Sequence, residues 1–125
     1  MKLFSKEWKS SKSQRKQRKY QKNAPLHTKS KFLSVHLSKD LRKKYNTRNI
    51  TLRKGDKVKI LRGNFKGKTG KIDRIDLKKS KAYILGIEII KKDGTKVSKP
   101  LNPSNLIINE LNTDDKKRLK RIRGK

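Results

Sequence analysis

The stretch that decides the fold is GDKVKILRGNFKGKTGKI, residues 55–72. Residues 57–60 alternate lysine with an apolar side chain, so a strand there would point Val58 and Ile60 into a core. A second segment with apolar residues among charged ones runs from 69 to 77, and three glycines lie in or beside the connection. The pattern predicts two short strands joined by a glycine-rich loop.

The loop combines bare backbone with cations, an amide and an aromatic ring, which are Arg62, Asn64, Phe65, Lys66 and Lys68. Glycine lets a ligand approach the backbone closely. Together these groups suit a folded RNA surface with exposed bases and phosphates. The alternative is a tight hairpin whose ring packs on the core and whose cations are merely solvated.

Further short strands are expected after this loop. Residues 82–90 are rich in β-branched side chains and would place Tyr83, Leu85, Ile87 and Ile89 on one face. Asp-Gly at 93–94 is a hairpin signal in which both central residues favour positive φ. Strands around residue 97 and at 106–108 follow. Because no helix long enough for a parallel crossover separates them, we expect a mainly β, antiparallel small barrel or sandwich over residues 50–112.

Helical patterns flank this region. In residues 32–49, Ser38 begins a short basic helix that ends at Asn46, with one apolar face formed by Leu37, Leu41 and Tyr45. Residues 113–125 begin Thr-Asp-Asp and continue with Lys and Arg, which predicts a basic C-terminal helix or tail.

Charge is the dominant property of the composition. The chain has 125 residues, with 39 Lys and Arg against 10 Asp and Glu, for a net charge of +29. Residues 1–31 alone carry a net charge of +10 and show no apolar periodicity, so we expect a long basic N-terminal extension that orders only on a polyanion. Nucleic acid is the expected partner. An anionic membrane would require an amphipathic helix, and the sequence predicts none of useful length.

Other chemistry finds little support. The chain has no Cys and only two histidines, His27 and His36, so we expect no metal, no cofactor and no small-molecule substrate. No catalytic triad can be assembled, and the chain is not expected to be an enzyme. Trp8 and Tyr20 could stack on RNA bases, or could simply be buried in a complex.

The stretch from Gly55-Asp56 through Lys66-Gly67 and Gly70 to Ile75 resembles the KOW motif, which implies an SH3-like barrel. The flanking sequences NAPLH at 23–27, LSKDLRKKY at 37–45, DGT at 93–95 and PSNL at 103–106 are similar to the universal twenty-fourth family of large-subunit ribosomal proteins, in its archaeal and eukaryotic branch. The high Lys, Ile and Asn content favours an archaeal member.

The resemblance implies a cytoplasmic, structural constituent of the large ribosomal subunit. Such a protein would bind large-subunit rRNA early in assembly, near the peptide exit tunnel and beside neighbouring ribosomal proteins. A KOW-type transcription-elongation protein or another basic protein that coats nucleic acid is the alternative. We expect the RNA contacts to be Arg15, Lys16, Arg18, Lys19, His27, Arg42, Lys43, Lys44, Arg48, Arg62, Asn64, Phe65, Lys66, Lys68, Ser104 and Asn105.

Overall fold

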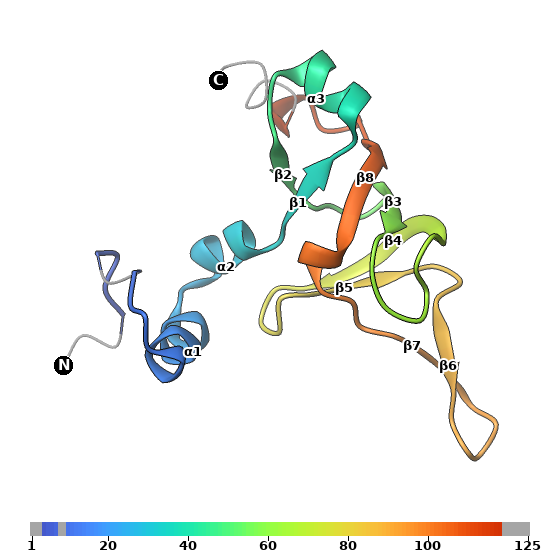
Figure 1. Ribbon diagram of the computed structural model, residues 1–125, viewed down its shortest axis with the longest axis horizontal. Helices are drawn as coiled ribbons and strands as arrows, with labels where there is room; N and C mark the ends of the chain where they lie inside the picture. The colour runs from blue at the N-terminus through green and yellow to red at the C-terminus, as the bar shows by residue number, and fades with distance from the viewer. Residues whose placement is uncertain (1–3, 8–9, 119–125) are drawn as a thin grey trace.

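A computed structural model describes residues 4–7 and 10–118 (Figure 1). The chain is mainly β, as predicted. Six strands form one sheet in the order β2-β1-β8-β3-β4-β5, and β6 and β7 form a separate hairpin. The strands are β1 (Ser34–Leu37), β2 (Asn49–Thr51), β3 (Lys57–Ile60), β4 (Thr69–Asp76), β5 (Lys81–Ile84), β6 (Glu88–Ile90), β7 (Lys96–Ser98) and β8 (Leu106–Glu110).

The sheet is mixed, so the prediction of a purely antiparallel sheet was wrong. β1 runs parallel to β8, with His36 opposite Ile107 and Leu37 opposite Ile108. The prediction failed because residues 34–37 were assigned to the segment containing the short helix. Their alternating pattern, with Val35 and Leu37 buried, makes them a strand instead.

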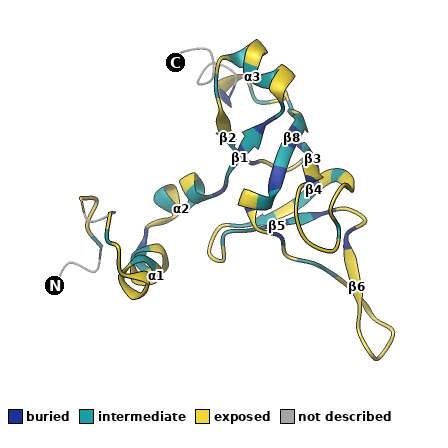
Figure 2. Ribbon diagram, viewed as in Figure 1, coloured by how far each residue is buried: buried dark blue, intermediate teal, exposed yellow. Residues whose placement is uncertain are grey.

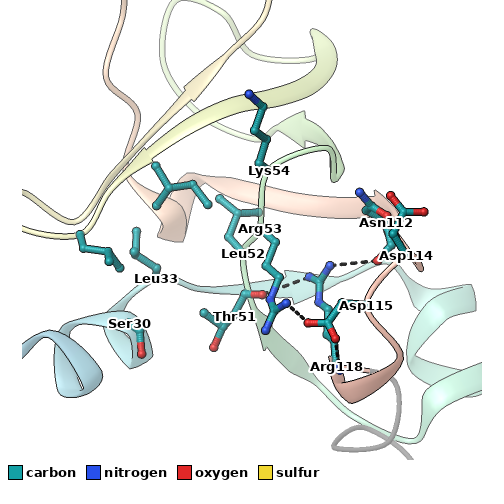
Figure 3. Close-up of a pocket in the computed structure, with 12 residues that line it drawn as sticks. Ser30, Leu33, Thr51, Leu52, Arg53, Lys54, Asn112, Asp114, Asp115 and Arg118 are labelled. Carbon is teal, nitrogen blue, oxygen red and sulfur yellow. Dashed lines mark hydrogen bonds and ion pairs between the residues drawn. The ribbon is translucent and has the colours of Figure 1, made fainter.

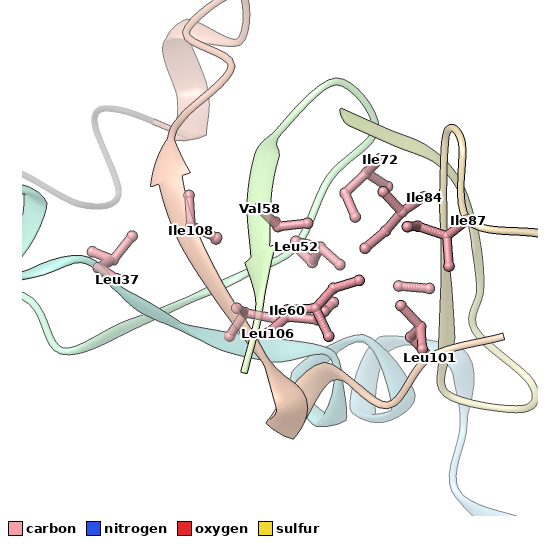
Figure 4. Packing of buried hydrophobic residues seen from close by; sticks show 12 residues of the cluster. Leu37, Leu52, Val58, Ile60, Ile72, Ile84, Ile87, Leu101, Leu106 and Ile108 are labelled. Carbon is pink, nitrogen blue, oxygen red and sulfur yellow. The ribbon is translucent and has the colours of Figure 1, made fainter. Parts of the chain in front are cut away.

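The core lies between the strands (Figure 4). Val58 and Ile60 of β3 are buried beside Leu106 and Ile108 of β8, which confirms the inward face predicted for residues 57–60. Ile72 of β4 is buried in the same cluster. The aliphatic cluster fixes the position of the loop that connects β3 to β4.

Residues 82–90 are not one strand, and the predicted apolar face was wrong. β5 ends at Ile84, and Gly86 adopts a φ of +78° in the turn before β6. Ile87 is buried with Ile84, while Leu85 and Ile89 are exposed. A turn within the segment resets the alternation, and period-2 reasoning from the sequence carried it through unbroken.

The β6–β7 hairpin projects from the sheet and is exposed over nearly its whole length (Figure 2). The predicted turn is confirmed at Gly94, whose φ is +85°, but Asp93 does not share the positive φ. Instead the Asp93 carboxylate accepts hydrogen bonds from the Thr95 hydroxyl at 2.7 Å and backbone N–H at 3.0 Å. These bonds lower the pKa of Asp93 below its ordinary value.

The predicted short helix is confirmed as α3 (Lys39–Tyr45). The Ser38 hydroxyl accepts a hydrogen bond from the Leu41 N–H, and Asn46 ends the helix in the left-handed conformation with a φ of 50°. Leu41 packs against the core, whereas Leu37 belongs to the preceding strand rather than to the helix.

The N-terminal extension contains two helices where the sequence predicted a tail without regular structure. They are α1 (Gln14–Asn23) and α2 (Leu26–Phe32), separated at Pro25, and they project away from the sheet (Figure 1). The prediction relied on apolar periodicity, but α1 consists largely of Gln, Lys and Arg, which favour helix by intrinsic propensity.

The C-terminal helix begins where its acidic residues were predicted to start it. The Asp115 carboxylate accepts hydrogen bonds from the backbone N–H groups of Lys117 and Arg118. The remainder of that predicted helix, like Trp8, lies outside the described residues. Among the helices that are described, none has the length and apolar character needed to cross a membrane.

Candidate nucleic-acid interface

The loop between β3 and β4, residues 61–68, is here called the glycine loop. Two successive turns form it, in which the Lys66 N–H donates to the Gly63 carbonyl at 3.0 Å and the Lys68 N–H donates to the Phe65 carbonyl at 3.1 Å. Gly63 and Gly67 have φ values of +90° and +86°. A Cβ at either would meet no atom within 4 Å, so glycine is required by conformation and not by space.

The glycine loop is fastened to the body of the protein. The Leu61 N–H donates to the Asn105 carbonyl at 2.8 Å, which joins the loop to the short 3-10 helix η1 (Pro103–Asn105). Phe65 packs against the core, and the ammonium groups of Lys68 and Lys99 each lie 5.3 Å from its ring centroid. The ring is therefore an anchor, as the core-packing alternative held, and it holds cations beside it.

The third glycine of the motif has a different role. A Cβ on Gly70 would lie 2.6 Å from Cγ2 of Ile84 and 3.0 Å from the Leu85 carbonyl oxygen. Its φ is not positive, so glycine is needed there because β5 approaches closely. Close packing of β4 against β5 thus fixes the base of the hairpin that presents the loop.

The ion pairs of the described residues all lie at the opposite end of the sheet from the glycine loop. Lys57 pairs with Glu110 at 2.7 Å, Arg53 pairs with Asp115, and Arg118 pairs with Asp56 at 2.7 Å. We call these six residues the ion-paired end. Within the described residues, the three cations of the glycine loop, Arg62, Lys66 and Lys68, form no ion pair. The loop therefore presents its positive charge uncompensated.

The buried pair between Arg118 and Asp56 was missed by the sequence reasoning. Both residues are almost fully buried, with 5% and 0% of their surfaces exposed, and both guanidinium Nη atoms donate to the carboxylate at 2.7 and 2.8 Å. Figure 3 shows Arg118 against Thr51 and Asn112, whose carbonyls accept further bonds from it. A cavity of about 540 Å³ adjoins the pair.

The signal that could have revealed this pair is weak. Asp56 is the only acid within residues 55–72, and its carboxylate also accepts the backbone N–H groups of Arg53 and Asn112. An acid between glycine and a strand suggests a turn, but nothing local to it indicates Arg118 as a partner 62 residues away.

The helix α3 carries a second group of predicted contacts, away from the glycine loop. Lys43 and Lys44 are exposed on its last turn, and Arg48 is exposed just beyond it. Arg42 is half-buried, and its Nε donates to the Leu37 carbonyl at 2.8 Å. Part of the Arg42 guanidinium thus serves the fold, while its neighbours face solvent.

The remaining predicted contacts divide between the two other regions. Arg15, Lys16, Arg18 and Lys19 are exposed on α1, and His27 is exposed on α2. Asn64 is exposed in the glycine loop, Ser104 is exposed on η1, and Asn105 is half-buried there. The predicted site is therefore three separate basic surfaces, on the helix pair, on α3 and on the glycine loop with η1.

Comparison with known proteins identifies the chain. Residues 11–125 match the family described as the eukaryotic ribosomal proteins L26 and their archaeal counterparts. The chain belongs to this family. The match confirms the resemblance found in the sequence and the ribosomal, cytoplasmic location that it implied, and it favours these over the transcription-elongation alternative.

Archaeal relatives in this ribosomal family are similar over nearly their whole length. "Large ribosomal subunit protein uL24" of Methanoculleus marisnigri is 48% identical over 114 residues, covering 91% of this chain and 94% of its own. The protein of the same name in Methanosphaera stadtmanae is 45% identical over 108 residues, covering 86% and 92%. The similarity thus includes both the sheet and the helix pair.

Proposed function

We propose that this protein is a structural, non-enzymatic constituent of the large ribosomal subunit that binds large-subunit rRNA and helps to initiate its assembly near the peptide exit tunnel. The observation that carries the RNA-binding role is the glycine loop. It combines three cations without an ion pair among the described residues with a backbone held by Phe65 and Asn105. The family match supports the ribosomal setting. Neighbouring ribosomal proteins would be its other partners.

The three basic surfaces would divide the work of binding. The sheet region, which we propose to be an SH3-like barrel of the KOW type, docks as a preformed body with the glycine loop and η1 on RNA. Lys43, Lys44 and Arg48 hold a second backbone segment. The helix pair reaches between RNA helices. Phosphate contacts would position the protein, and RNA shape more than base sequence would select the site.

Preorganisation explains why the glycine loop should matter beyond its charge. A flexible lysine-rich segment loses conformational entropy when it binds, whereas this loop is already held by two turns and by the bond to η1. Its cations would therefore meet phosphates at lower entropic cost than cations elsewhere on the surface. This argument separates the loop from the general attraction of a chain with a net charge of +29.

Reversing charge in the loop tests the proposal. The double variant Lys66→Glu with Lys68→Glu should weaken binding to a large-subunit rRNA fragment and reduce the salt slope by about 2, one for each lost phosphate contact. With six to ten contacts in all, wild-type affinity should fall ~10³–10⁵-fold between 50 and 200 mM salt. Filter binding over that range measures both quantities.

The matched control is Lys78→Glu with Lys79→Glu. These lysines are exposed in the turn between β4 and β5, and their reversal changes the net charge by the same amount. Equal losses from the two double variants would contradict a specific role for the glycine loop. A nearly flat salt dependence of the wild-type protein would contradict the RNA-binding proposal as a whole.

A further inference from the structure

A cluster of aromatic rings lies outside the core of the sheet. Phe4, Tyr20 and Phe32 come from the N-terminal segment, α1 and α2. The centroids of Phe4 and Tyr20 are 4.9 Å apart, and those of Tyr20 and Phe32 are 6.2 Å apart in an edge-to-face arrangement. None of the three belongs to the core cluster, and all are half-buried. Packing within the sheet therefore does not account for them.

These rings line a pocket of about 630 Å³. That volume falls within the ~300–1,000 Å³ usual for ligand sites. Two lysines, Lys6 and Lys31, stand at the pocket with exposed side chains, and the polar groups of Gln21 and His27 complete its wall. The described residues that line it include neither Asp nor Glu. We call it the aromatic pocket.

The chemistry of the lining selects the kind of occupant. Aromatic walls favour a flat ring, because stacked and edge-to-face rings attract one another beyond simple burial. Lysines without a neighbouring carboxylate in the lining favour a negatively charged ligand, and the surrounding helix α1 adds Arg15, Arg18 and Lys19. An unpaired nucleotide satisfies both requirements, since its base is flat and its phosphates are anionic.

The helix pair itself gives a second reason. Neither α1 nor α2 contains a buried residue or an acid in its first turn, so two basic helices are held together with little apolar contact. The ring contacts join α1 to α2 and to the segment before them. A ligand that inserts a ring and brings negative charge would strengthen the same joint that the aromatic residues form.

We propose that the aromatic pocket receives one unpaired RNA base, stacked on Tyr20 with Phe4 and Phe32 beside it, while Lys6 and Lys31 meet the adjoining phosphates. The inference rests on the proposed function in that RNA is the partner. It adds a base-binding site to a protein whose other surfaces would contact the RNA backbone.

The test uses the full chain and two RNA hairpins, one with a single unpaired 2-aminopurine and the other fully paired in the same stem. Stacking should quench the fluorescence of the unpaired base on binding. Tyr20→Leu should weaken binding of the hairpin with the unpaired base by about 5- to 150-fold and remove the quenching. Affinity for the fully paired hairpin should not change, and Tyr20→Phe should retain both affinity and quenching.

Tyr83→Leu is the matched control, because Tyr83 is also half-buried and lies on β5, away from the pocket. It should leave the quenching intact. Circular dichroism of Tyr20→Leu establishes that α1 and α2 persist, and if they do not, Lys31→Gln replaces it and should weaken binding of the unpaired base selectively.

Unchanged quenching in both Tyr20→Leu and Lys31→Gln would overturn the pocket while leaving the glycine-loop proposal standing. An equal loss on both hairpins would also overturn it, since the ring would then serve only the fold. A photo-crosslinker at position 20 that attaches to a protein rather than to RNA in assembled ribosomes would assign the pocket to a protein partner. Failure of the wild-type chain to bind either RNA would instead defeat the proposed function.

Discussion

The ion-paired end and the glycine loop lie at opposite ends of the sheet, and each carries three cations. At the ion-paired end, Arg53, Lys57 and Arg118 are matched by acids that come from distant parts of the chain. In the glycine loop no described residue pairs with the cations. The difference separates charge that holds the fold together from charge that is left for a ligand, in a protein whose composition makes the two look alike.

The physical basis of the difference is where acids fall in the sequence. Between Asp56 and Asp73 there is no acid, so the hairpin that contains the glycine loop has none of its own. The acids at 110 and 115 follow β8, whose far end is at the start of β3. Antiparallel pairing of β3 with β8 therefore brings acids to one end of the sheet and leaves the other end positive.

The largest effect should come from breaking the buried pair. Asp56→Asn leaves the Arg118 guanidinium buried without a counter-charge, and removing one partner of such a pair costs about 3–5 kcal/mol of unfolding free energy. Urea denaturation of the free protein measures the loss. If the unfolding free energy changes by less than about 1 kcal/mol, the ion-paired end is not what stabilises the C-terminal segment on the sheet.

An intermediate effect is expected at the glycine loop. Gly67→Ala places a Cβ on a residue with a φ of +86°, and the left-handed conformation costs a non-glycine residue roughly 1–2 kcal/mol. Gly67→Asn should recover part of this stability, because asparagine tolerates that conformation better. The same denaturation experiment applies, and a loop that accepts alanine without loss would show that its backbone is not held as described.

The smallest effect should come from the exposed pair at the ion-paired end. Glu110→Gln removes the partner of Lys57, whose side chain is 43% exposed, while that of Glu110 is 67% exposed. Exposed pairs contribute about 0–1 kcal/mol. We expect a change within that range and no loss of rRNA affinity. A large drop in stability would mean that all three pairs act as one network rather than as one buried pair and two surface ones.

Much of the candidate site could be predicted from local sequence because its causes are local. The alternation of residues 57–60, the glycines of the loop and the capping residues Ser38 and Asn46 each act within a few positions of the chain. The predicted strand over 82–90 failed for the same reason, since a single turn at Gly86 was enough to reverse which side chains face the core.

The sequence by itself determined that this protein carries a glycine-and-lysine hairpin, a basic helix and far more cations than acids, and its motifs placed it in a ribosomal family. Only the tertiary structure decided which cations are already used. Arg118 meets Asp56, β1 meets β8 and Tyr20 meets Phe4 and Phe32 through the packing of the elements that carry them. Such contacts depend on how whole elements pack, and no periodicity in the chain encodes the partner.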